Sequence, residues 1–98
     1  MNEWTDEQIR KWVLHKCWID NQENPGRPGL FLNEEKLEAG SPPLERIAEA
    51  VNFLQDEEQI TGEIGRAFLP NKHGKVSHIL NLKLTAKGIK EIQAQSAP

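Results

Sequence analysis

The sequence predicts an α+β domain in which helices precede a β-hairpin and a short helix follows it. Apolar residues recur at helical spacing over residues 44–54. Two strand-like segments follow at 60–69 and 76–84, separated by residues rich in turn formers. Thr85 then has the position of a helix cap.

Length and composition set the broad class of the protein. With 98 residues, of which 37% are hydrophobic, the chain has room for one core, so we expect a single domain over 1–98 with frayed ends at 1–4 and 96–98. Cys17 is the only cysteine, which favours a reducing compartment. The acidic start lacks an apolar signal region, and no apolar run approaches the roughly 20 residues that span a bilayer. We therefore expect a cytoplasmic protein.

The first helix is expected from Thr5 to about Asn21. Thr5 and Gln8 have the spacing of a capping box, and Pro25 stops the helix soon after Asn21. The apolar residues of this segment cover more than one stripe of the helix, which predicts burial on two sides and, in so short a chain, a homodimer. The residues expected at the dimer contact are Trp12, Leu14 and Trp18.

Two short elements are expected before the second long helix. Residues 30–32 form a minimal apolar strand after a Pro- and Gly-rich loop. Asn33 can cap a second helix that runs through Ala39, and Gly40 ends it.

The third helix is expected to open at Ser41, with Ser41 as the cap and Pro42 at the first helical position. Its core stripe consists of Leu44, Ile47, Ala48, Val51 and Leu54. Its opposite face carries Glu45, Arg46, Glu49, Asn52 and Asp56.

The hairpin is expected to consist of strands 60–69 and 76–84 around a turn at 70–75. Alternation along the second strand predicts that Val76, His78, Leu80, Leu82 and Leu84 share one side, with Ile79 on the other.

The net charge of the chain changes sign near the start of this hairpin. Residues 1–60 carry 6 Lys and Arg against 13 Asp and Glu, whereas residues 61–98 carry 6 against 2. Such a bipolar molecule can hold a polyanion at one end and repel it at the other.

This order of elements resembles the winged helix-turn-helix superfamily over residues 44–92, about half of the chain. The segments at 50–54, 60–62 and 84–88 (Leu-Thr-Ala-Lys-Gly) are similar to those of the small YjcQ-like proteins of bacteria and their phages. The resemblance implies three helices, a β-hairpin wing and a short C-terminal helix, with residues 42–57 as the recognition helix.

Our leading prediction is a small prokaryotic or phage DNA-binding protein of this superfamily, a transcription regulator without catalytic activity, although winged helices also dock on proteins. Its phosphate and base contacts would come from the recognition helix and the wing. The residues expected to bind DNA are Arg46, Asn52, Arg66, Lys72, His73 and Lys75. Glu45 and Glu49, one turn apart on the recognition helix, oppose DNA binding, because phosphates require Lys or Arg.

The alternative is a protein-interaction adaptor, of the antirepressor or DNA-mimic type, whose acidic helix face meets a basic partner. Phe53 lies about 180° from Leu44 on the helix and so falls on the polar face, as an anchor for a partner or under cover of another element. The residues expected at such a contact are Glu45, Glu49, Phe53 and Asp56.

We expect no enzyme, no cofactor and no metal site. The chain has no Gly-rich phosphate loop, no nucleophile elbow and no zinc-protease motif. Cys17 lies in an apolar helical segment, where an inert buried thiol is the usual state. The histidines and Cys17 lack the close spacing of a structural zinc site.

Overall fold

A computed structural model describes residues 4–23, 26, 29–69 and 72–96, without the side chains of 67–69, 72–74 and 95–96. It is an α+β domain with three α-helices and a three-stranded antiparallel sheet. The elements in order are α1 (Asp6–Glu23), β1 (Leu30–Asn33), the 3-10 helix η1 (Glu34–Lys36), α2 (Leu44–Asp56), β2 (Ile60–Leu69), β3 (Lys72–Leu84) and α3 (Ala86–Ser96).

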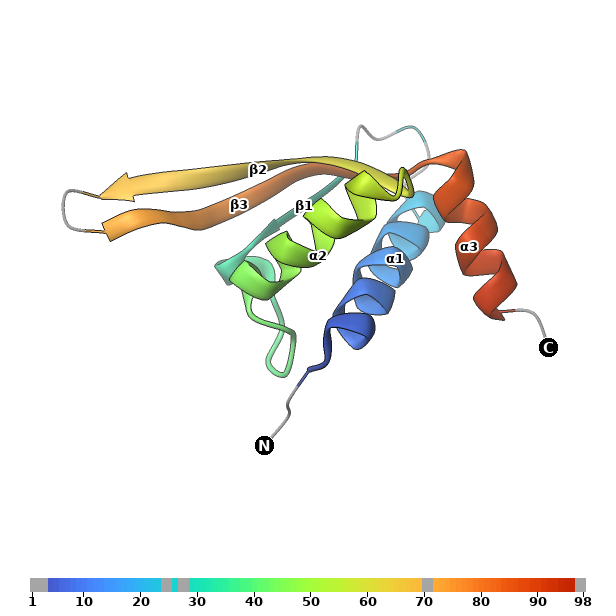
Figure 1. Cartoon of the computed structure of the whole chain (residues 1–98), viewed down its shortest axis with the longest axis horizontal. Helices are drawn as coiled ribbons and strands as arrows, with labels where there is room; N and C mark the ends of the chain where they lie inside the picture. The colour runs from blue at the N-terminus through green and yellow to red at the C-terminus, as the bar shows by residue number, and fades with distance from the viewer. Residues whose placement is uncertain (1–3, 24–25, 27–28, 70–71, 97–98) are drawn as a thin grey trace.

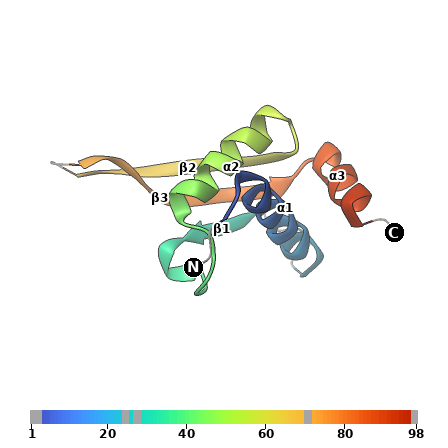
Figure 2. The ribbon, with the colours of Figure 1, turned by 60° about the horizontal axis from the view of Figure 1, so that its bottom comes forward.

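The sheet has the order β1-β3-β2, so that β3 lies in the middle. The helices α1 and α2 lie against one side of the sheet, and α3 lies beyond the end at which β3 stops (Figures 1 and 2). The β2–β3 hairpin continues past α2 and projects from the body of the domain (Figure 1). The domain therefore has one long axis, with extents of 48 × 34 × 25 Å.

The core lies between α1, α2 and the sheet. The apolar stripe predicted for α2 is confirmed, because all five of its side chains are buried. They meet four buried residues of α1, namely Ile9, Val13, Leu14 and Cys17. The predicted capping box is also present. The Thr5 N–H donates to Gln8 Oε1 at 3.0 Å, and the Gln8 N–H donates to Thr5 Oγ1 at 3.1 Å.

The expected second helix at 33–39 is wrong. Asn33 does act as a cap, and its Oδ1 accepts from the Lys36 N–H at 2.9 Å. The turn that it caps is the three-residue η1, since Leu37 is already extended at φ −76° and ψ 129°. The apolar residues between Glu34 and Gly40 are Leu37 and Ala39, two positions apart, so a longer helix here would have no hydrophobic stripe to bury.

The expected start of the next helix at Ser41 is also wrong, because α2 begins at Leu44. Pro43 is the N-cap residue and has extended backbone angles of φ −60° and ψ 143°. A residue that precedes proline is pushed out of the helical region, so Pro42 cannot be the first helical residue. The Pro-Pro pair therefore delays the helix.

The strict alternation predicted for β3 is wrong at its centre, where Ile79 is fully buried. Residues 61–63 of β2 pair across residues 80–83 of β3, so β3 carries one extra residue there. Asn81, at φ 56°, lies in this bulge. A second shift of register follows Gly65, and each shift changes which face the next side chains occupy. The buried side chains of β3 are consequently Val76, Ile79, Leu82 and Leu84.

The Leu-Thr-x-x-Gly segment attaches α3 to the turn between α2 and β2. Thr85 Oγ1 accepts from the Gly88 N–H at 3.1 Å and donates to the Glu58 carbonyl at 2.5 Å. The Thr85 N–H donates to the Gln59 carbonyl at 3.0 Å. Gly88 passes so close to that carbonyl oxygen that a Cβ atom would lie 2.0 Å from it. This segment therefore has a structural role in the domain.

Candidate interaction surface on α2

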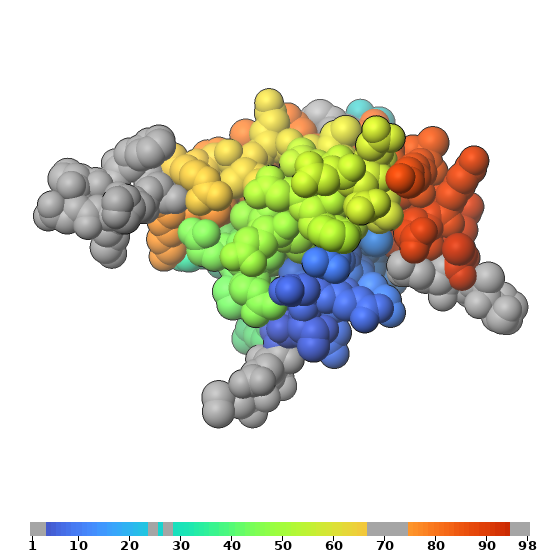
Figure 3. All heavy atoms as spheres, in the orientation of Figure 1, coloured from blue at the N-terminus to red at the C-terminus, as the bar shows by residue number. Residues whose placement is uncertain are grey.

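The outward face of α2 is acidic and carries one large aromatic ring. Side chains of α2 fill the middle of the surface seen in Figure 3, in light green above the blue of α1. The exposed residues of this helix face are Glu45, Glu49, Asn52, Phe53 and Asp56, and Glu57 follows them at the end of the helix. We call Glu49, Phe53, Asp56 and Glu57 the acid–aromatic surface.

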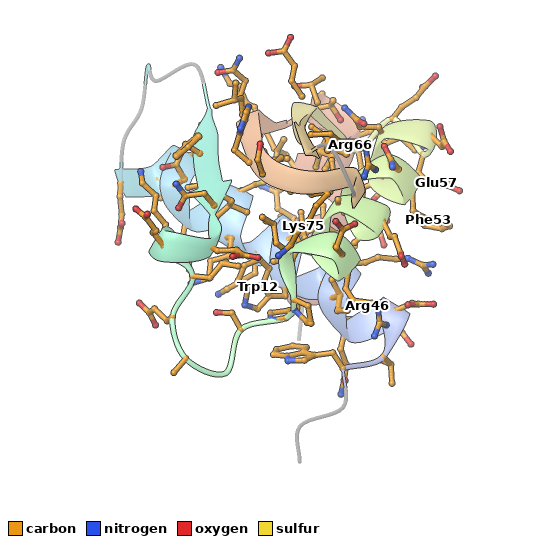
Figure 4. All side chains as sticks on the ribbon, turned by 90° about the vertical axis from the view of Figure 1, so that its left-hand side faces the viewer. Trp12, Arg46, Phe53, Glu57, Arg66 and Lys75 are labelled. Carbon is orange, nitrogen blue, oxygen red and sulfur yellow. The ribbon has the colours of Figure 1, made fainter. Side chains whose placement is uncertain are left out.

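Phe53 is 40% exposed and is the one exposed large hydrophobic side chain among the described residues. The ring is covered in part, by one side chain of α1. The guanidinium carbon of Arg10, from α1, lies 3.6 Å from the ring centroid. Glu49 and Glu57 lie one helical turn before and after Phe53, and Phe53 and Glu57 project from the same side of α2 in Figure 4.

Among the described residues, the carboxylates of the acid–aromatic surface have no ion-pair partner. Within the described part of the chain, no ion pair involves Glu49, Asp56 or Glu57. Asp56 and Glu57 lie at the C-terminal end of α2, where the helix dipole is negative and disfavours carboxylates. A positive charge placed here would lower the electrostatic energy of both the side chains and the helix end.

Arg46, expected to read a base, is bonded to residues of its own chain. Its Nη2 donates to Asp6 Oδ1 at 2.7 Å and to the Trp4 carbonyl at 3.2 Å. These bonds tie α2 to the first turn of α1, and Figure 4 shows Arg46 directed toward that helix. Reading a base would require Arg46 to break a charge-assisted hydrogen bond.

Two basic side chains of the hairpin, those of Arg66 and Lys75, also face carboxylates of the same chain. Arg66 Nη1 lies 4.0 Å from Glu45 Oε2, and Lys75 Nζ lies 3.3 Å from Glu34 Oε1. The other oxygen of Glu45 accepts from the backbone N–H of Val76 at 2.7 Å. The side chains of Lys72 and His73, expected to bind phosphate with them, lie outside the described residues. Arg66 and Lys75 thus meet the body of the domain, while Asn52 stands exposed on α2.

The residues expected at a dimer contact do not share one surface. Leu14 is 2% exposed in the domain's own core, so its side chain is not available to a second subunit. Trp12 and Trp18 are half-buried at the edge of the core. Trp12 and Phe31 line a hollow of about 250 Å³ between α1 and the β1–η1 segment. The homodimer stays a prediction, and the mass of the protein in solution tests it.

Cys17 is unsuited to nucleophilic chemistry. Burial, with a smaller contribution from the charge of Asp20, raises the pKa of its thiol from 9.0 to about 12. The thiolate is therefore scarce at neutral pH. The described side chains contain no group of three or more His, Cys, Asp and Glu residues that is placed to hold a metal ion.

Sequence reasoning missed two residues of this region. Glu57 lies four residues after Phe53, and this helical spacing was a signal that could have found it. Arg10 comes from another helix, more than forty residues away along the chain, and no local pattern connects it with Phe53.

Comparison with protein-family models, with curated proteins and with solved structures finds no match for this chain. The similarity to winged helix-turn-helix and YjcQ-like proteins therefore stays a prediction. In the part of the chain that the structure describes, no helix is long and apolar enough to cross a membrane.

Proposed function

We propose that this protein is a non-catalytic docking module of the winged-helix type, which binds a basic protein partner through the acid–aromatic surface of α2. The observation that carries the proposal is the exposed Phe53 ring between carboxylates that have no cation of their own in the described chain. An aromatic anchor within a charged rim is a common composition of protein interfaces.

The order and pairing of the elements support the winged-helix assignment. A helix, a short strand, a turn, a helix and a hairpin follow one another, and the sheet has the order β1-β3-β2. In this assignment, η1 would take the place of the middle helix and α2 that of the recognition helix. The scaffold would present the outward face of α2 to the partner. The function is inferred from that face, because a fold alone does not determine a function.

The charges on α2 favour a basic partner over DNA. Phosphates supply most of the affinity of a DNA-binding protein and require Lys or Arg. The outward face of α2 instead presents Glu49, Asp56 and Glu57, and its one arginine, Arg46, is bonded to Asp6. A duplex laid along the outward face of α2 would be repelled by these three carboxylates.

DNA binding through the hairpin is the second candidate, and the projection of the hairpin from the body favours it (Figure 1). The ion pairs of Arg66 and Lys75 are exposed, and such pairs contribute little free energy. A phosphate can therefore replace either carboxylate at small cost. This mode would use the hairpin and leave α2 uncovered.

A binding experiment with two probes separates these candidates. The full chain is titrated with a random-sequence DNA duplex and with a nona-lysine peptide, at low and at high salt. We expect peptide binding that weakens with salt, and no duplex binding at either concentration. Duplex binding at low salt that Lys75→Glu abolishes would support the hairpin candidate instead.

A matched pair of triple variants locates the contact. Glu49→Gln, Asp56→Asn and Glu57→Gln together remove three charges from the acid–aromatic surface while keeping side-chain size. The control, Glu23→Gln, Glu35→Gln and Glu38→Gln, removes three exposed charges elsewhere. We expect the first variant to lose peptide binding and the control to keep most of it. Equal losses in the two variants would reject the α2 surface as the docking site.

A further inference from the structure

The contact between Arg10 and Phe53 indicates what kind of cation the surface accepts. The distance of 3.6 Å from the guanidinium carbon to the ring centroid is well inside the roughly 6 Å range of a cation–π contact. Within the described residues Arg10 takes part in no ion pair. Its guanidinium group is therefore held by the ring and not by a carboxylate.

The surroundings of the ring complete a site for a second cation. Phe53 remains 40% exposed despite Arg10, so ring surface is left for another group. Glu49 and Glu57 flank the ring along the helix, and Glu49 also lines a small cleft of about 70 Å³ between α1 and α2 that Arg10 borders. A cation that reaches Phe53 thus meets an aromatic face and acceptor oxygens together.

We infer that the partner presents an arginine side chain to Phe53, and that Arg10 competes for the same ring in the free protein; this inference rests on the proposed docking function. Arginine suits the site better than lysine. A planar guanidinium lies flat on a ring while its edge donates two parallel hydrogen bonds to one carboxylate. A lysine ammonium can approach a ring as a point charge, but it has no planar group that does both at once. In the free protein the Arg10 guanidinium already lies over the Phe53 ring, which is the first of these two contacts.

Competition by Arg10 has a measurable consequence. When the partner's arginine binds, it shares the ring with Arg10 or displaces it, and the contact that Arg10 loses subtracts from the affinity. Removing the Arg10 guanidinium uncovers the ring. Lys11 is the matched control, because it is an exposed neighbour on α1 whose loss changes the charge equally and leaves the ring covered.

The test compares nona-arginine with nona-lysine, two peptides of equal charge, by calorimetric titration of the full chain. We expect nona-arginine to bind several-fold more tightly. Phe53→Leu should abolish this preference, because it removes the ring on which the guanidinium stacks, and should weaken nona-arginine binding more than nona-lysine binding. Arg10→Gln should bind nona-arginine about two- to fivefold more tightly than Lys11→Gln does, which is the worth of one exposed cation–π contact.

Three other outcomes would reject, in turn, the preference for arginine, the competition by Arg10 and the docking function. Equal binding of the two peptides, lost in the triple variant that neutralises the α2 surface, would reject the arginine inference and leave the proposed function standing. Equal affinities of Arg10→Gln and Lys11→Gln would reject competition by Arg10. Absence of binding by either peptide at low salt would reject the docking function, and the inference with it.

Discussion

The carboxylate of Glu45 and the backbone N–H of Val76 are joined by a hydrogen bond of 2.7 Å, which links the first turn of α2 to β3. Because Val76 is 2% exposed, its N–H has little access to water. Glu45 therefore holds the hairpin against the helix, and this structural task separates it from the carboxylates of the acid–aromatic surface.

Glu45→Ala should lower the free energy of unfolding by about 1–2 kcal/mol, because it leaves the Val76 N–H without an acceptor. Glu45→Gln keeps an acceptor oxygen and should cost less than half as much. Urea denaturation of the two variants measures the difference. Equal losses for alanine and glutamine would mean that the charge of Glu45 matters and the hydrogen bond does not.

Gly88→Ala tests the attachment of α3. In an unconstrained helix this change stabilises by up to about 1 kcal/mol, because alanine has the higher helix propensity. Here the new Cβ would lie 2.0 Å from the Gln59 carbonyl oxygen, so backbone must move, and we expect a destabilisation of about 1–3 kcal/mol. The sign of the change in thermal unfolding temperature shows whether the higher helix propensity or the steric clash has the larger effect. A more stable variant would contradict the close approach.

Glu58 follows α2 with a left-handed backbone at φ 62°, a conformation that favours glycine. The Gln59 N–H donates to the Leu54 carbonyl and the Glu58 N–H to the Gln55 carbonyl, both at 2.9 Å, as in a Schellman motif. Glu58→Gly should raise the free energy of unfolding by about 0.5–1 kcal/mol, since it relieves the strain. Glu58→Ala keeps the strained backbone and serves as the control. Equal effects of the two changes in chemical denaturation would show that strain is absent.

Stability should fall at alkaline pH because of Cys17. In the unfolded chain the thiol loses its proton near pH 9.0, whereas the folded chain holds the proton to about pH 12. The contribution of this group to stability is therefore complete below pH 9 and is lost as the pH rises, at up to about 1.4 kcal/mol per pH unit. Denaturation between pH 8 and pH 10.5 measures the slope, and Cys17→Ala should flatten it. Parallel curves for the two proteins would contradict a buried thiol.

Local signals in the sequence predicted much of this fold. The stripe of α2 was readable because residues three and four apart share one side of a helix, and the Thr5–Gln8 cap depends only on neighbours. The strand Ile60–Leu69 was likewise predicted with its observed bounds. Each of these features is determined within a few residues of chain.

The features that depend on distant segments were not predictable in the same way. The bulge at Asn81 shifts the phase of β3, and nothing in the alternating run marks its position. Gly29 and Asn81 approach so closely that a Cβ at Gly29 would lie 2.5 Å from the Asn81 carbonyl carbon, which only the folded sheet reveals. The stacking of Arg10 on Phe53 and the bonding of Arg46 to Asp6 join two helices across many residues. Counting charges in the sequence therefore overestimated how many basic side chains are available to bind a ligand.

The most direct test of docking through α2 is amide chemical-shift mapping of the labelled full chain, titrated in turn with nona-arginine and with a random DNA duplex at low salt. We expect nona-arginine to shift the signals of Glu49, Phe53, Asp56 and Glu57 most strongly, and the duplex to shift none of them. Duplex-induced shifts centred on Arg66 and Lys75, with the α2 signals unmoved by either probe, would contradict a protein-docking role for α2.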